Sequence, residues 1–351
     1  MTTTADAPVR SGAPPRSGSM RTRRLVVLVV LVGLVAAAAL ASIAVGTRSL
    51  GLGEVWRALD DRDPTSEAAV IVQQLRVPRT VLGLMVGAAL GMSGALMQGH
   101  TRNPLGDPGL LGVTAGASLA VVCAIAFFDV GSVSGQVWFA FAGALSGTVL
   151  VYAIGSAGRG GATPITLALA GAALSALLYA MVRAIVVSDT QTLDSFRFWQ
   201  VGALAGRGAD VAWQVAPFIA VGVVLALANA PALNLLGLGE DVARGLGQRI
   251  WLARAVGLAA ITLLCGAATA ACGPIAFVGL VVPHVVRALT GPDHRWLVPC
   301  SALLGAVLLL SADVLGRVLA RPGELQVGIV LAVIGAPFFI ALVRRRKTMA
   351  L

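Results

Sequence analysis

The side chains that could carry out chemistry are few in this chain and widely spaced. Neither metal-ligand spacing nor a CxxC pair occurs among its histidines and cysteines: His100, His284, His294, Cys123, Cys265, Cys272 and Cys300. The apolar runs contain no HExxH, GxSxG or paired aspartates. The only lysine, Lys347, follows arginines, whereas a phosphate-binding loop needs glycines before its lysine. The sequence therefore predicts no metal site, cofactor or catalytic residue, and any ATP hydrolysis must take place in another polypeptide.

The elements that hold these side chains are predicted to be membrane-spanning helices. The chain is 57% hydrophobic and 12% charged, whereas soluble domains carry roughly 25% charged residues. Its apolar runs are about 20 residues long, which suits spanning helices better than the alternating segments of about 10 residues in a β-barrel. The predicted fold class is an all-α polytopic membrane protein.

Apolar runs divide the chain into ten predicted spans. They cover residues 25–45, 77–98, 110–128, 137–156, 164–187, 211–229, 251–271, 274–289, 297–319 and 326–343. Residues 1–23 are predicted to be a disordered tail, residues 24–346 a ten-helix domain, and residues 347–351 a second tail. The first run resembles a secretory signal peptide but is too long for a signal h-region, so we expect a retained first span.

The charges predict the orientation of the spans. An even number of spans places both termini on one side of the membrane. With the termini inside, 16 Lys and Arg residues fall on inner segments and 10 on outer segments. The positive-inside rule therefore predicts that both termini are cytoplasmic. The formal net charge of +10 is then mostly a consequence of topology, and it calls for no nucleic-acid partner.

Polar and glycine-rich motifs interrupt the apolar runs at four places. They are Arg76-Val77-Pro78-Arg79; residues 98–112, with Arg102-Asn103-Pro104-Leu105 and Asp107-Pro108-Gly109; residues 233–247, with Leu238-Gly239-Glu240; and residues 273–287, with Gly273-Pro274 and Pro283-His284. In this order they resemble the FecCD-type permeases of type II ABC importers, which carry ferric siderophores, haem or vitamin B12. The resemblance covers residues 24–346.

This resemblance implies a ten-helix permease of the cytoplasmic (inner) membrane, in which spans 2–5 and 7–10 form an inverted repeat. It implies three kinds of partner: ABC ATPase subunits, a substrate-binding protein, and a second permease subunit, identical or related. The implied mechanism is alternating access. Ferric siderophore is the leading cargo, with cobalamin or haem as alternatives. An ion-coupled secondary transporter would bury an ionisable residue near the midplane, but Arg183 and Asp313 fall towards outer ends.

The resemblance assigns docking of the binding protein to Arg76, Arg79 and Arg317. In the family, arginines at these motif positions pair with acidic residues of that protein, which sets the docking register. Two alternatives need no partner protein. The arginines could anchor the chain at the membrane interface, or Arg317 could pair with Asp313 at i, i+4 on one helix.

The segment Pro231–Arg249, between spans 6 and 7, is too polar to span and is predicted on the inner side. By resemblance it forms a pair of short coupling helices that press into a groove of the ATPase. The residues that carry this motif are Leu238, Gly239, Glu240, Ala243, Arg244, Leu246 and Gly247. The alternative is an interfacial helix that lies on lipid.

The family lines its pathway largely with spans 5 and 10. The residues that this places near a substrate are Tyr179, Met181, Arg183, Gln326, Gly328 and Pro337. The sequence does not say which helix faces point inward. The loop Arg102–Pro108 is expected to be structural, because Asn103-Pro104 ends one helix and Asp107 can cap the next.

Overall fold

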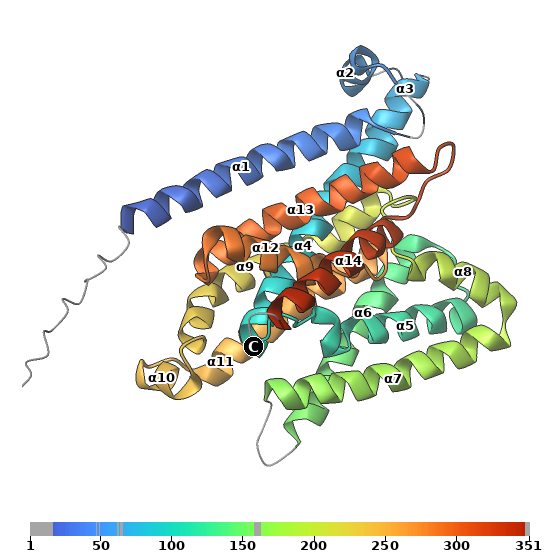
Figure 1. Ribbon diagram of the computed structural model, residues 1–351. Helices are drawn as coiled ribbons and strands as arrows, with labels where there is room; N and C mark the ends of the chain where they lie inside the picture. The colour runs from blue at the N-terminus through green and yellow to red at the C-terminus, as the bar shows by residue number, and fades with distance from the viewer. Residues whose placement is uncertain are drawn as a thin grey trace, which may run out of the picture.

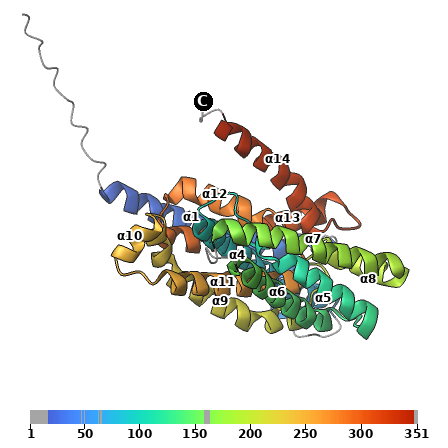
Figure 2. The same cartoon turned by 90° about the horizontal axis from the view of Figure 1, so that it is seen from below.

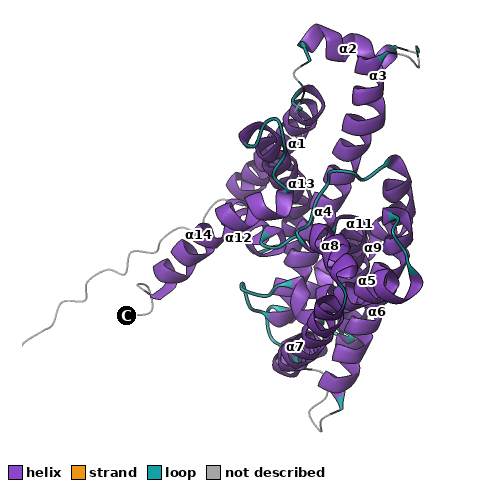
Figure 3. Cartoon of the chain, turned by 90° about the vertical axis from the view of Figure 1, so that its right-hand side faces the viewer, coloured by secondary structure: helices purple, strands orange, loops and turns teal. Residues whose placement is uncertain are grey.

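The computed structural model describes residues 17–46, 48, 50–61, 63, 66–157 and 163–347, and the regular elements in these residues are helical (Figure 3). The longer helices are α1 (Ser17–Ala44), α4 (Val77–Thr101), α5 (Val113–Phe128), α6 (Val133–Ser156), α7 (Pro164–Ser188), α9 (Ala209–Leu236), α11 (Ile250–Cys272), α12 (Val278–Thr290), α13 (His294–Leu319) and α14 (Val327–Lys347). The shorter ones are α2 (Leu52–Asp60), α3 (Glu67–Ala69), η1 (Val70–Arg76), η2 (Pro108–Leu111), α8 (Thr190–Gln200) and α10 (Glu240–Gly245). The predicted all-α class is confirmed.

Among the described residues, seven helices are long and apolar enough to cross a membrane: α1, α4 with η1 and α3, α6, α7, α9, α11 and α13. Three shorter apolar helices lie in α5, α12 and α14. Together these segments coincide in order with the predicted apolar runs. The number of spans and the side of the termini stay predictions. We use "inner" and "outer" for the two ends of the bundle according to the predicted orientation.

Helix α1 begins earlier than the sequence predicted. Residues 17–23, expected to belong to a disordered tail, form its first turns, and residues 1–16 lie outside the described part of the chain. Arg23, at the end of these turns, and the adjacent Arg24 have partners in the fold. Arg23 donates to the carbonyl of Ala288 at 3.0 Å, and Arg24 donates to the carbonyl of Thr290 at 2.9 Å. These bonds to the end of α12 satisfy carbonyls that a helix terminus leaves unpaired. At the other end of the chain, residues 348–351 lie outside the description.

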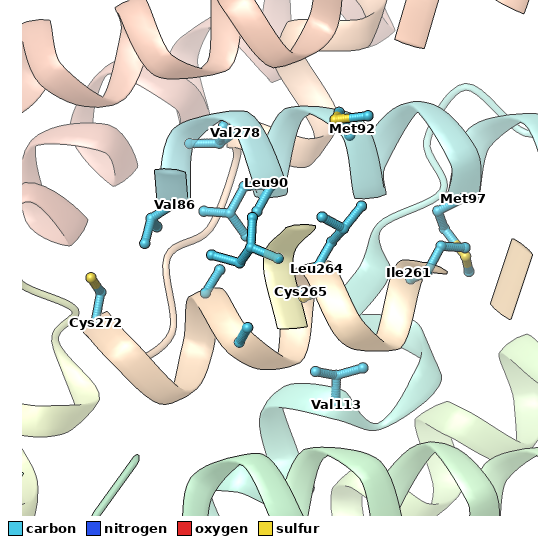
Figure 4. Packing of buried hydrophobic residues seen from close by; sticks show 14 of the residues in the cluster. Val86, Leu90, Met92, Met97, Val113, Ile261, Leu264, Cys265, Cys272 and Val278 are labelled. Atoms are coloured by element: carbon cyan, nitrogen blue, oxygen red, sulfur yellow. The ribbon is translucent and has the colours of Figure 1, made fainter. Parts of the chain in front are cut away.

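Helix α4 lies at the centre of the bundle, between α9, α11, α12 and α13 (Figures 1 and 2). Figure 4 shows Leu90 of α4 and Leu264 of α11 among the buried side chains between these two helices. Glycines bring the helices close together. A Cβ atom on Gly91 or Gly94 would overlap backbone atoms of Ser301 in α13 or Gly279 in α12. Small residues allow this approach where lipid supplies no hydrophobic drive between helices.

The packing order agrees with the predicted inverted repeat. In that repeat α4–α7 correspond to α11–α14, so α4 and α11 are the equivalent first helices of the two sets. Helix α4 packs against α12 and α13, and α11 packs correspondingly against α5 and α6. Close glycine contacts occur again between α5 and α6, where Gly116 meets Gly143. Each set of four helices therefore places its second and third members against the first helix of the other set.

An irregular segment precedes the second helix of each set, and the two segments meet inside the bundle. Residues 102–112 lead into α5, and residues 273–277 lead into α12. Asp107, Pro108 and Pro274 line a shared cavity of about 90 Å³. Asp107 accepts a hydrogen bond from the amide of Gly109 at 2.7 Å, which caps η2. The predicted cap is thus present, on the single 3₁₀ turn before α5.

We expect a Gly94→Ala variant to lower the free energy of unfolding by about 1–3 kcal/mol, because the new methyl group would push α4 away from Gly279 of α12. The measurement is the unfolding midpoint of the purified protein in detergent. Gly33→Ala in α1 is the matched control, since no atom lies within 4 Å of its added Cβ. That control should be neutral or slightly stabilising. Equal effects of the two changes would contradict close packing at Gly94.

Candidate functional site

A buried carboxylate joins two arginines at the outer end. The Asp313 side chain is fully buried. It accepts two hydrogen bonds from Arg79, at 2.7 Å from Nη2 and 3.0 Å from Nε, and a third from Arg317 at 2.7 Å. Arg79 also pairs with Glu324 at 2.7 Å. We call Arg76, Arg79, Asp313, Arg317 and Glu324 the outer arginine cluster.

Two of the arginines predicted to dock a partner bind the end of α1. Arg76 donates to the carbonyls of Ile43 at 2.9 Å and Ala44 at 2.8 Å. Arg317 donates to the carbonyls of Ser42 and Val45, both at 2.9 Å. These two arginines are only 5% and 2% exposed. They satisfy carbonyls that a helix C-terminus leaves unpaired, where positive charge is also favoured.

The alternative reading of Arg317, a local pair with Asp313, is therefore observed. A docking role for the three arginines stays a prediction. The outer arginine cluster borders a cavity of about 300 Å³, which Arg48 also lines. The charges that are accessible there are Arg48 at 57% exposure, Glu324 at 33% and Arg79 at 14%.

At the inner end, Glu240 forms ion pairs with arginines from three segments. Its carboxylate lies 2.5 Å from Arg254 of α11, 3.4 Å from Arg102 after α4, and 3.7 Å from Arg244 of α10. Gly239 precedes it with φ of +111°, a backbone conformation that favours glycine. Glu240 therefore fixes the short helix α10 to the inner ends of the bundle.

Between Pro231 and Arg249 the structure contains one separate short helix, α10, where a pair of coupling helices was predicted. Residues 231–236 continue α9 to Leu236, so that only α10 stands apart as a helix. Leu236 is buried against the core, which explains why this stretch stays in α9. Around α10, Ala243 is buried, whereas three apolar side chains are exposed: Leu238, Val242 and Leu246. We call these three residues the inner apolar face.

An amide network that sequence reasoning missed lies beside this segment. The Asn234 side chain donates to Asp293 at 2.7 Å and accepts from the backbone amide of His294 at 2.8 Å. Asp293 also pairs with Arg24 of α1 at 3.3 Å. The available sequence signal was a polar residue near the end of the apolar helix α9. The network joins the inner ends of α1, α9 and α13.

The residues predicted along the pathway do not gather in one place. Tyr179 is half-buried and packs against the apolar cluster of α5, α6 and α7. Met181 and Arg183 of α7 are exposed, as is Pro337 of α14. A Cβ atom on Gly328 would overlap the carbonyl oxygen of Val201, so Gly328 is a packing position.

Gln326, by contrast, lines a cavity of about 360 Å³ at the outer end, which we call the outer cavity. Its other walls come from α6, α8 and the loop before α9, and they include Gln136, Trp199 and Arg207. Sequence reasoning did not single out Arg207. The outer cavity is mixed in character, with amide and guanidinium groups beside aromatic rings. Among the described residues, no three His, Cys, Asp or Glu side chains come together as a metal site.

Comparisons with known proteins give a consistent result. Residues 33–345 match the FecCD transport family. The ferric enterobactin transport system permease protein FepD of Escherichia coli is 44% identical over 330 residues, which cover 94% of this chain and 98% of that protein. The iron(3+)-hydroxamate import system permease protein FhuB of Bacillus subtilis is 43% identical, over 87% of this chain and 79% of that protein.

The fold also matches a solved structure. It is described as an inward-facing conformation of a metal-chelate type ABC transporter. The TM-score is 0.79 at 32% sequence identity, and the match covers 91% of this chain and 98% of the solved one.

Proposed function

The chain belongs to the FecCD transport family, and on this premise we propose that it is the permease subunit of an ATP-driven importer that carries a ferric siderophore across the cytoplasmic membrane. One observation carries the choice of cargo: the 44% identity to a ferric enterobactin permease over nearly the full length of both chains. The mechanism is alternating access, in which a pathway opens first to the outside and then to the inside. The permease itself forms no covalent bond with its cargo.

ATP hydrolysis belongs to a separate ATPase subunit in this proposal, because the chain lacks a phosphate-binding loop. The inner apolar face is the proposed contact with that subunit. Leu238, Val242 and Leu246 are exposed on a short segment that Glu240 holds to α11 and to the loop after α4. Displacement of α10 by the ATPase would therefore reach the inner ends of these helices. A helix seated in a groove is a common mode of such contacts.

The substrate-binding protein is proposed to dock over the outer arginine cluster. Arg76 and Arg317 contribute mainly by fixing the end of α1, whereas Arg48, Arg79 and Glu324 offer accessible charge around the 300 Å³ cavity. Complementary charge at the rim of an interface sets the docking register and the association rate.

A second permease subunit, identical or related, is proposed to pack against α7 and α14. Both helices expose large apolar side chains, including Leu177 and Val187 on α7 and Val333 and Ile340 on α14. Figure 2 shows that α14 turns away from the rest of the bundle towards its C-terminal end. A partner on this side would cover these faces and enclose the pathway between the two subunits.

The experiment that tests the function is uptake by cells that lack this gene and other chelate importers. Iron-labelled siderophores, labelled haem and labelled cobalamin are supplied in parallel. We expect loss of uptake of one ferric siderophore, restored by the wild-type gene and dependent on ATP.

If the gene restores uptake of haem or cobalamin alone, the proposed cargo is wrong, but the proposed importer function stands. Uptake of none of the three would contradict a chelate importer. Uptake that persists without ATP and collapses with the proton gradient would favour an ion-coupled transporter.

A further inference from the structure

Arg207 places a positive charge in the outer cavity without a counter-charge. It lies in the loop between α8 and α9 and lines the cavity of about 360 Å³. Its Nε atom is buried and has no hydrogen-bond partner, and none of the described residues forms an ion pair with it within 4.0 Å. Burial lowers the pKa of Arg207. The residue as a whole is half-buried and lines the cavity, so part of its guanidinium can reach a ligand there. Burying the Nε donor without a partner is costly, and a ligand oxygen would supply that partner.

Arginines of the outer end have two kinds of partner. Arg76 and Arg321 donate to backbone carbonyls, of Ile43 and Gly46 respectively, and others pair with carboxylates. Arg79 and Arg317 share Asp313. Arg197 of α8 pairs with Asp194 at 3.1 Å. Among the described residues that line the outer cavity, Arg207 is the charged one, and it has neither a carboxylate nor a carbonyl partner.

The nearest carboxylate in the sequence is used elsewhere. Asp210, three residues after Arg207, accepts a hydrogen bond from Ser134. Ser134 in turn accepts one from Gln214 at 3.1 Å. Asp210 is thus held towards α6, and it forms no ion pair with Arg207 among the described residues.

The remaining walls of the cavity suit a ligand with oxygen acceptors and flat rings. Gln136, Ser195 and Gln326 add polar side chains, and Phe198 and Trp199 add aromatic ones. Amide and guanidinium groups donate hydrogen bonds to anionic oxygens, and the guanidinium bonds are the stronger because they are charge-assisted. Aromatic rings pack against other aromatic rings. The cavity also touches the start of α14, which borders the proposed pathway.

We propose that Arg207 binds an anionic oxygen of the transported iron chelate at the outer end of the pathway. The ligand class is a ferric chelate with net negative charge, such as one whose iron is held by catecholate or carboxylate oxygens. Arg207 then selects such chelates over uncharged ones of similar size. This inference rests on the proposed function and deepens it.

The test is uptake kinetics in cells that lack other importers and carry the wild-type gene or an Arg207→Gln variant. The probes are a negatively charged ferric tris-catecholate and an uncharged ferric tris-hydroxamate. Loss of a charge-assisted hydrogen bond should raise KM for the anionic chelate roughly ten- to a hundred-fold and leave uptake of an uncharged chelate unchanged. Arg207→Lys should recover part of the loss. Arg197→Gln, on the exposed and paired arginine of α8, is the matched control and should behave as wild type.

A stability measurement separates binding from a structural role. Removing an uncompensated charge should leave the unfolding midpoint of Arg207→Gln equal to or above that of the wild type. A lower midpoint with less protein in the membrane would assign Arg207 to the fold and overturn the inference.

Different results of this experiment would contradict the inference and the proposed function. If the wild-type gene restores uptake of neither chelate, and of no other siderophore, the function is wrong. If it restores the uncharged chelate alone, or if Arg207→Gln leaves anionic uptake unchanged or lowers both chelates equally, the inference is wrong. It is also wrong if the variant weakens binding of the substrate-binding protein and keeps the preference between chelates.

Discussion

An Asp313→Asn variant is expected to lose roughly 3–5 kcal/mol of unfolding free energy. Asp313 is fully buried and accepts hydrogen bonds from Arg79 and Arg317. Removal of its charge leaves two guanidinium groups close together, and one of them, Arg317, is itself almost completely buried. The repulsion between these groups and the loss of charge-assisted hydrogen bonds both destabilise the folded state. The measurement is denaturation of the purified protein in detergent, with its level in the membrane followed in parallel.

The matched control is Asp194→Asn on α8. Asp194 and Arg197 also form an ion pair, at 3.1 Å, but both side chains are about 60% exposed. An exposed pair contributes at most about 1 kcal/mol, so this variant should be nearly neutral. A similar small loss in both variants would show that Asp313 is not the buried centre of the outer arginine cluster.

A Val242→Glu/Leu246→Glu double variant is expected to reduce uptake roughly ten-fold or more, while the protein remains folded in the membrane. Val242 lies on α10 and Leu246 directly after it, and at least half of each side chain is exposed, so their replacement removes little internal packing. In the proposed complex they enter the ATPase, and truncation of a central contact in such an interface commonly costs 2 kcal/mol or more, about thirty-fold in binding. The measurements are labelled-chelate uptake and co-purification of the ATPase.

Asp241→Ala is the control within the same helix, because the Asp241 side chain is almost fully exposed and lies on α10 beside Val242. It should transport normally. Normal uptake by the glutamate double variant as well would mean that the inner apolar face does not contact an ATPase. An interfacial segment resting on lipid would then be the better account of residues 237–249.

The helices and their caps could be predicted from the sequence where interactions between residues close in the chain determine them. The apolar runs correspond to the ten apolar helical segments because each span must satisfy its own backbone hydrogen bonds. The cap at Asp107 could also be predicted, since donor and acceptor are two residues apart. The assignment to the FecCD family rested on motifs that lie at these helix ends.

Residues whose partners are distant in sequence were harder to predict. Arg76 and Arg317 looked like surface charges because their acceptors lie at the end of α1, for Arg317 more than 270 residues away. The segment from Pro231 to Arg249 was predicted to form separate coupling helices. Helix α9 nevertheless continues through Pro231, because Leu233 and Leu236 pack in the core. Arg207 is a lone cation between two glycines in the sequence. Only the fold brings α6, α8 and the start of α14 around it.

The hydrogen bonds at the two ends of α1 limit which parts of the bundle can slide past one another. Only 11% of the apolar window of α1 is buried, so side-chain packing holds it weakly. At the inner end Arg24 binds Asp293, and at the outer end Arg317 binds Ser42. Asp293 caps the start of α13 and Arg317 lies near its end, about 36 Å away along the helix. Hydrogen bonds therefore connect α1 to α13 at both ends. We expect the two helices to move together as one rigid unit when the pathway switches between its outward and inward openings.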